Sequence, residues 1–165
     1  MNSEADVGSE LSSRLGYLLK RAFLELEDLH AIHLAPIEVN ARELTVLLLL
    51  GGREPESQQQ AAERLGVDQQ AAERLGVDRT TMVGLLDGLE SKGLTARQTD
   101  PNDRRRNVIG LTAAGSRALD KAKKASDEAE RQLLEALSEA EAAQLRALLG
   151  RIGVRGRPAN ESGAH

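Results

Sequence analysis

Apolar residues recur at three- and four-residue steps over residues 10 to about 32, which predicts an amphipathic helix. Its apolar positions are Leu11, Leu15, Leu18, Leu19, Ala22, Leu26 and Leu29. Pro36 closes this region, because the residue before a proline is biased away from the helical conformation. Asn40 is suited to cap a second helix over residues 41–50, which Gly51-Gly52 ends.

The middle of the chain contains ten residues written twice. Residues 59–68 and residues 69–78 both have the sequence QQAAERLGVD. Each copy predicts a short helix with two alanines and a leucine on its apolar face, followed by a turn at Gly-Val-Asp. We expect a loop over the preceding REPES segment and a helix N-cap at Ser57.

A further helical pattern follows the repeat, from residue 79 to residue 92, with Asp78 as its cap and Gly93 as its end. Its buried stripe would be Met82, Leu85, Leu86 and Leu89. Leu94 then begins a strand, and residues 108–111 alternate as the returning strand of a hairpin. The tip of this hairpin is the PNDRRR segment, in which Pro101-Asn102 supplies the turn chemistry. Helix, helix and hairpin in this order predict a winged helix-turn-helix.

Two more helices are predicted after the hairpin. Thr112 caps a long helix over residues 113–137, which is rich in Ala, Lys and Glu. Ser138 and Glu141 have the spacing of a capping box, which opens a last helix ending near Ile152. Residues 1–9 and 153–165 are polar, and we expect a disordered arm and a disordered tail.

The composition restricts the class of protein. A length of 165 residues suits one domain with a sizeable core, built from aliphatic residues because Tyr17 and Phe23 are the only aromatic ones. The absence of cysteine excludes disulfides and thiol catalysis and fits a reducing cytoplasm. No apolar run is long enough to span a bilayer, and the acidic N-terminus has no apolar signal-peptide region.

The distribution of charge favours one region as a nucleic-acid contact. The net charge of −4 argues against a uniformly basic DNA-binding protein. Residues 79–106 nevertheless carry six basic and four acidic side chains, whereas residues 1–50 carry four basic and eight acidic ones. The positive charge therefore lies where a recognition helix and a wing would meet DNA.

Two motifs resemble the MarR family of bacterial transcriptional regulators. They are AAERLGVDRTTMVGLLDGLESKGL, residues 71–94, and TDPNDRRRNVIGLTAAG, residues 99–115. The second places D-x-x-D-R-R at the hairpin tip and L-T-x-x-G at the start of the next helix. The resemblance extends from residue 15 to residue 152. It implies a mainly α fold with a small β-hairpin wing, in a dimeric winged helix-turn-helix architecture.

The resemblance also implies partners and a mode of action. Residues 10–36 and 113–152 would form the dimerisation helices, and residues 37–112 would form the DNA-binding lobe. The homodimer would straddle a palindromic operator on double-stranded DNA. Family members usually repress genes and are released by small ligands, often phenolic or other aromatic acids. We therefore expect a ligand-responsive cytoplasmic repressor that needs no cofactor and does not bind membranes.

The N-terminal part of the recognition helix would read base edges in the major groove. Arginine there can pair with guanine, and threonine can contact a phosphate or a thymine methyl group. Gly84 and Gly88 occupy exposed positions where the family often carries arginine or polar residues, so base readout would rely more on the wing. We predict DNA contacts by Arg79, Thr80, Thr81, Val83, Gly84, Arg97, Asp103, Arg104, Arg105 and Arg106.

The three consecutive arginines of the wing are the second part of this site. An arginine inserted into a narrow minor groove gains from its negative potential. In the family, the aspartate of the Asp103-x-Arg105 pair holds the arginine in position. A solvated charge run is the alternative interpretation, but the hairpin frame and the nearby aspartates favour DNA contact.

His30 and His33 are three residues apart near the end of the first helix. This spacing would suit one metal ion, yet no cysteine and no obvious third ligand accompany the pair, although Glu27 and Asp28 are near. We favour a partly buried pair near the ligand cleft or the dimer interface, and predict no metal site. Tyr17 and the two histidines are the predicted effector-binding residues. No catalytic motif is present.

Only one of the two copies of the repeat can pack in the helix-turn-helix, so the other must lie elsewhere. In one continuous helix the apolar faces of the two copies would differ by about 80°, so both cannot fill the same slot. We place the second copy in the slot, because Gly76-Val77-Asp78 supplies the short turn before the recognition helix. The alternative keeps the first copy in place and extrudes residues 69–77.

The duplication also raises a second class of function. Disturbed helix-turn-helix geometry would leave a folded dimer with impaired DNA binding, which would act as a ligand-binding or interaction module. A purely structural coiled coil is excluded by the strand-wing-strand pattern.

Overall fold

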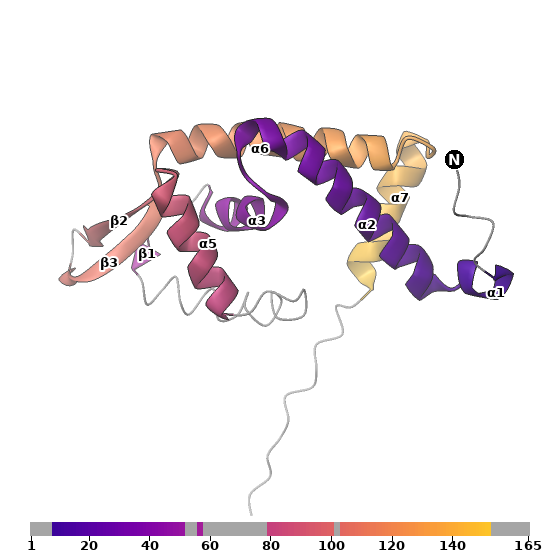
Figure 1. Cartoon of the computed structure of the whole chain (residues 1–165), viewed down its shortest axis with the longest axis horizontal. Helices are drawn as coiled ribbons and strands as arrows, with labels where there is room; N and C mark the ends of the chain where they lie inside the picture. The colour runs from indigo at the N-terminus through magenta and orange to yellow at the C-terminus, as the bar shows by residue number, and fades with distance from the viewer. Residues whose placement is uncertain (1–7, 52–55, 58–78, 101–102, 153–165) are drawn as a thin grey trace, which may run out of the picture.

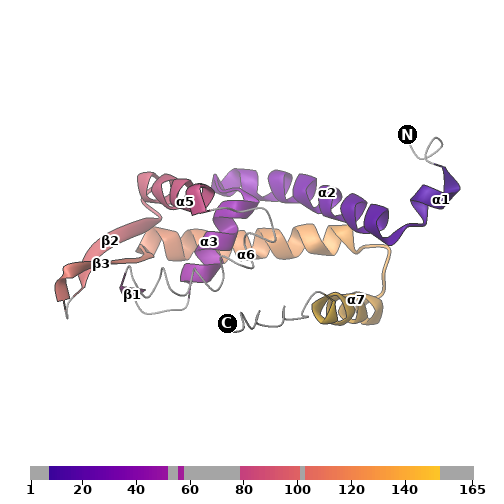
Figure 2. The same ribbon diagram turned by 90° about the horizontal axis from the view of Figure 1, so that it is seen from below.

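A long helix, α6 (Ala113–Leu133), is the spine of the molecule. The computed structural model describes residues 8–51, 56–57, 79–100 and 103–152. The helix α2 (Leu15–Leu34) packs along α6, as Figures 1 and 2 show. α5 (Arg79–Ser91), β2 (Thr95–Asp100) and β3 (Asp103–Leu111) lie at one end of this pair, and α1 (Ser9–Ser12) and α7 (Glu139–Arg151) lie at the other. Both copies of the repeat, the arm, the tail, Asp78 and Pro101-Asn102 lie outside the described residues.

The predicted single helix over residues 10–32 was wrong, because the chain breaks into α1 and α2. Arg14 takes an extended conformation between them, with φ −71° and ψ 134°. The hydroxyls of Ser12 and Ser13 donate to the carbonyls of Ser9 and Glu10, at 3.0 and 2.9 Å. These serine hydroxyls compete with the backbone hydrogen bonds of a helix. The spacing of apolar residues gives no sign of this competition.

The helix α3 (Ala41–Leu50) has the predicted bounds, and Asn40 is its cap. Asn40 Oδ1 accepts from the backbone N–H of Glu43 at 2.9 Å, and Glu43 Oε2 accepts from the N–H of Asn40 at 3.0 Å. This capping box satisfies two helix-end donors reciprocally. A short 3-10 helix, η2 (Ala35–Ile37), contains Pro36 and connects α2 to α3.

The core joins α2, α3 and α6 to the recognition helix α5 (Arg79–Ser91). Leu34, Leu47 and Leu89 are fully buried in it. Met82, Leu85 and Leu86 pack against this core, which confirms the predicted stripe of α5. The exposed face of α5 is therefore fixed by the burial of the opposite face.

The wing is part of a three-stranded antiparallel sheet. β2 (Thr95–Asp100) pairs with β3 (Asp103–Leu111), and β1 (Glu56–Ser57) pairs with the other edge of β3. β1 was not predicted, because two residues are too short to show alternation. Ser57 lies opposite Val108 in this strand, where the sequence had suggested a helix cap. β3 begins earlier than predicted, at Asp103, so the three arginines belong to the strand directly after the turn and not to a loop.

The root of the wing is held by the L-T-x-x-G motif. Gly93 ends α5 in the left-handed conformation, with φ 73°, as its position predicted. Thr112 donates through its N–H to Leu94 O at 3.1 Å and through its hydroxyl to Gly93 O at 2.6 Å. The same hydroxyl accepts from the N–H of Gly115 at 3.0 Å, which is the predicted cap of α6. A Cβ on Gly115 would lie 1.9 Å from Leu94 O, so this close approach requires glycine.

The helix α6 ends at Leu133, four residues before the predicted end. Ser138 caps α7 in an extended conformation, with ψ 163°. The helical conformation of α6 must therefore end before Ser138. The predicted capping box of α7 is confirmed: Glu141 N–H donates to Ser138 Oγ at 3.2 Å, and Ser138 N–H donates to Glu141 Oε2 at 2.8 Å. The hydrogen bond from the backbone N–H of Ser138 to the carboxylate of Glu141 holds the pKa of Glu141 below its usual value. Among the helices described, none is long and apolar enough to cross a membrane.

Candidate nucleic-acid interface

Between residues 80 and 84, the exposed side chains of α5 are small or apolar. Thr80 and Gly84 are exposed, Val83 is 51% exposed, and Thr81 is half-buried. A Cβ on Gly84 would have nothing within 4 Å, so this part of the helix has room for a close partner. Arg79 is the first residue of the helix, as predicted. Small and apolar groups of this kind suit contact with the thymine methyl groups of a major groove.

Gly88 differs from the prediction, which placed it at an exposed position. It is half-buried, and a Cβ there would lie 3.8 Å from Glu43 Oε1. The helix turns this glycine toward α3, whereas Gly84, one turn earlier, faces open space. Only Gly84 therefore belongs to the exposed face.

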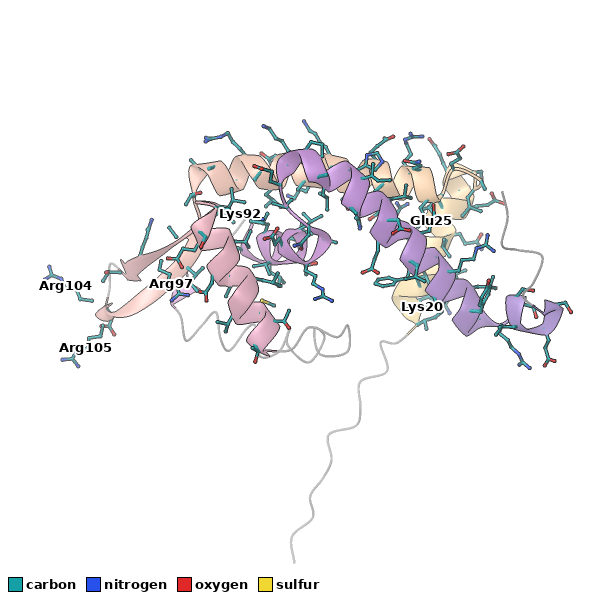
Figure 3. The ribbon with its side chains drawn as sticks, in the orientation of Figure 1. Lys20, Glu25, Lys92, Arg97, Arg104 and Arg105 are labelled. Atoms are coloured by element: carbon teal, nitrogen blue, oxygen red, sulfur yellow. The ribbon has the colours of Figure 1, made fainter. Side chains whose placement is uncertain are left out.

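Arg104 and Arg105 project from the far end of the β2–β3 hairpin (Figure 3). Both side chains are exposed, and Arg106 follows them in β3. Asp103 Oδ1 accepts from the backbone N–H of Arg105 at 3.0 Å. Asp103 therefore fixes the backbone of Arg105, two residues further on, as expected if the aspartate holds this arginine in position. The hairpin closes just before this point, where Asp103 is opposite Asp100.

Arg97 connects the wing to the recognition helix. One of its terminal nitrogens lies 2.9 Å from Asp87 Oδ1, and its Nε lies 3.2 Å from Glu90 Oε2. All three side chains are partly exposed, so these ion pairs add little to stability, but the planar guanidinium fixes a geometry. The structure therefore places this predicted DNA-contact residue between β2 and α5. The sequence prediction missed the acidic partners, whose three-residue spacing on one helix face was the available signal.

A model of the MarR family matches residues 39–106. The transcriptional repressor CouR bound to a 23-mer DNA duplex is 34% identical, with 86% of this chain and 94% of that chain covered and a TM-score of 0.68. This chain belongs to the MarR family. A MarR-family regulator from Rhodococcus sp. RHA1 is 30% identical, with 88% and 98% covered and a TM-score of 0.70. CouR bound to p-coumaroyl-CoA is 31% identical, with 93% and 100% covered and a TM-score of 0.71.

Two curated relatives align with this MarR-family chain over part of their length. The chain spans 64% of the transcriptional repressor NicR of Pseudomonas putida, at 22% identity over 111 residues. It spans 45% of a putative transcriptional regulatory protein for the hcr operon of Thauera aromatica, at 37% identity over 74 residues. The solved structures therefore match most of the chain, whereas the curated relatives match only part of it.

The two histidines of this MarR-family chain join α2 to α6. His30 Nε2 lies 2.9 Å from Ser126 Oγ, and His33 Nε2 lies 3.0 Å from Gln132 Oε1. Across the described part of the chain, no group of three His, Cys, Asp or Glu residues could hold a metal ion. Tyr17 is half-buried, but thirteen residues of helix separate it from His30, roughly 20 Å along the axis. The three predicted effector residues therefore do not form one cluster in the protomer.

A charged pair on α6 lies close to the histidines. Arg131 donates to Glu128 Oε2 at 2.9 Å through its Nε, and this bond holds the pKa of the Glu128 carboxyl below its usual value. Both side chains are exposed to a degree that screens the pair, so it contributes little to stability.

Proposed function

We propose that this MarR-family chain is a DNA-binding transcriptional regulator. It binds a palindromic operator as a homodimer and represses transcription, and a small ligand releases it from the DNA. The observation that carries the proposal is that the exposed face of α5 and the arginines of the wing lie at the same end of the molecule, linked by Arg97. A helix in the major groove and an arginine-bearing wing in the adjacent minor groove would fit this arrangement. The DNA-bound CouR structure supports it.

The end of the protomer opposite the wing supports a second copy as the partner. Large apolar side chains are exposed on α1, along α2, and in and beside α7, within the regions 10–36 and 113–152 that we assign to dimerisation. Isolated proteins seldom leave an apolar surface of this extent in water, and a two-fold dimer would read a palindrome. These side chains are Leu11, Leu15, Leu18, Leu19, Phe23, Leu24, Ile32, Leu137, Leu148, Leu149 and Ile152.

The proposal needs neither a cofactor nor a catalytic residue. The similar proteins named above are regulators by their descriptions. We place the protein in the cytoplasm, where a regulator of transcription meets its DNA. Because CouR binds p-coumaroyl-CoA, we infer that the effector of this chain is an aromatic or phenolic acid or a derivative of one.

Replacing both His30 and His33 by alanine should raise the effector concentration that releases DNA about tenfold, because a hydrogen bond to a charged ligand contributes about 1.5–3 kcal/mol. The measurement is fluorescence anisotropy of a bound duplex titrated with hydroxylated aromatic acids and their CoA thioesters. Ser126→Ala is the control, since it removes the partner of His30 and keeps the ring. Unchanged release by the double variant would refute an effector role for the histidines.

Val83 should read a thymine methyl group, since its exposed apolar side chain lies beside the open Gly84 on α5. Uracil in place of the contacted thymine should weaken binding about fourfold, the equivalent of one buried methyl group at ~0.8 kcal/mol. Binding curves for duplexes with single thymine-to-uracil changes measure this. Val83→Ala should abolish most of the difference between the two bases. Equal affinities at every position would contradict the assignment.

The duplicated segment gives the test of the proposed function against its alternative. The full chain and a variant lacking residues 69–78 are titrated with the same labelled duplex at several salt concentrations. A competent regulator predicts strong and salt-dependent binding by both forms. Binding by the shortened form alone would favour the impaired dimer, acting as a ligand-binding or interaction module. The copy that occupies the helix-turn-helix slot lies outside the described residues, and our assignment of the second copy stays a prediction.

A further inference from the structure

Lys92 lies immediately after the last residue of α5, and its ammonium group contacts three acceptors. Nζ donates to Glu38 O at 2.7 Å, to Glu43 Oε1 at 2.8 Å and to Glu43 Oε2 at 2.9 Å. Figure 3 shows Lys92 at the junction of α5 and the wing. An ammonium group has three hydrogens to donate, and three acceptors lie within hydrogen-bond distance. The three hydrogens are therefore matched by acceptors within the protein, although the Lys92 side chain is 40% exposed.

Glu43 is a buried charge with two functions. Its residue is 6% exposed, and its carboxylate both caps Asn40 and accepts from Lys92. A buried carboxylate is tolerated when it is paired and hydrogen-bonded. Glu43 joins the first turn of α3 to the end of α5, and Lys92 extends this connection to the left-handed turn at Glu38 (φ 59°). Gly88 lies one turn earlier on the same side of α5, where a Cβ would be in ordinary contact with the carboxylate at 3.8 Å.

We propose that Lys92 and Glu43 are positioning residues for DNA recognition, which anchor the C-terminal end of the recognition helix on α3. This inference rests on the proposed function. The simplest alternative is that Lys92, a basic residue at the end of a recognition helix, contacts a phosphate directly. The two roles predict opposite effects of neutralising Glu43. Loss of an anchor weakens DNA binding, whereas loss of a negative charge beside a phosphate contact strengthens it.

The test uses the full chain and the duplex that it enriches from a random pool. Lys92→Met and Glu43→Gln should each weaken binding about tenfold, and the double variant should be no weaker than either, because both changes break one connection. The salt dependence should keep the wild-type slope. Lys92→Arg should retain most of the affinity, since a guanidinium also reaches a carboxylate. Lys123→Met, which removes an exposed lysine of α6, is the control of equal charge and should bind like the wild type.

Tighter binding by Glu43→Gln, or a slope reduced by about one released ion in Lys92→Met, would overturn the positioning role. Hydrogen exchange of the DNA-free protein provides the second readout. Lys92→Met should accelerate exchange in α5 and in the first turn of α3, and leave the pairing of α2 with α6 unchanged. Unchanged exchange in α5 would also overturn the inference. A wild-type chain that enriches no duplex would contradict the proposed function instead, and the exchange result would still decide whether the anchor exists.

Discussion

Replacing Arg104 and Arg105 together with alanine should lower the affinity for an enriched duplex about 100-fold, if each arginine contributes about 1.4 kcal/mol through its minor-groove and phosphate contacts. Both side chains are exposed at the end of the hairpin farthest from the core, so the protein should fold as before. The slope of log affinity against log salt should fall by roughly two ions, because two cations no longer displace counterions. Fluorescence anisotropy at four or more salt concentrations measures both quantities.

The matched control for the wing is Lys123→Ala with Lys124→Ala, which removes the same charge from exposed positions on α6. If the arginines act by contact, this control should change affinity by less than about threefold, since screening weakens charges beyond a Debye length of about 10 Å. An equal loss in both double variants would mean that net charge, and not the wing, determines affinity. Asp103→Ala should reproduce part of the wing effect, because Asp103 holds the backbone of Arg105.

Gly115→Ala should destabilise the protein by about 3 kcal/mol or more, because the new methyl group collides with backbone that cannot move aside cheaply. A Cβ there would lie 1.9 Å from the carbonyl oxygen of Leu94 and 2.9 Å from its carbon. The same carbonyl oxygen accepts the N–H of Thr112, so a displacement would also weaken the connection between α6 and the wing. Urea unfolding at one fixed protein concentration measures the change in free energy.

Gly84→Ala is the matched control for this substitution, since the same change is made in a helix where a Cβ meets nothing within 4 Å. It should stabilise the protein by up to about 1 kcal/mol, the difference in helix propensity between the two residues. It should also weaken DNA binding if the recognition helix approaches bases closely at this position. Equal stabilities of the two variants would show that α6 can shift away from the wing without loss.

The features of the fold that could be predicted from sequence are those determined by local chemistry. The caps at Asn40, Thr112 and Ser138 each satisfy helix-end donors within three residues, so their side-chain types reveal them. The left-handed Gly93 is revealed in the same way. The break between α1 and α2 and the early end of α6 were missed, because apolar periodicity continues across both.

The same distinction between local and long-range interactions applies to the candidate site. The recognition helix and the wing follow from a motif with fixed spacing, which is why the helix that begins at Arg79 and the hairpin that carries Arg104 could be predicted. Their contacts with DNA stay predictions. The contacts that position them join residues distant in sequence: Arg97 with Asp87 across ten residues, and Lys92 with Glu43 across 49. The three-residue spacing of Asp87 and Glu90 indicates two acidic residues on one helix face, but it does not show which basic residue will face them. Glu43 in particular has the sequence signature of a helix cap, and its second partner is created only by tertiary packing.

The most direct test of the account is selection from a random pool of duplexes by the full chain, followed by measurement of the salt dependence of the enriched sequence. The account predicts an inverted repeat with half-sites roughly 10 base pairs apart from centre to centre, bound by one dimer. Its log affinity should fall linearly with log salt concentration. A pool in which no sequence is enriched, from a chain that is folded and dimeric, would contradict the claim that this protein is a competent DNA-binding regulator.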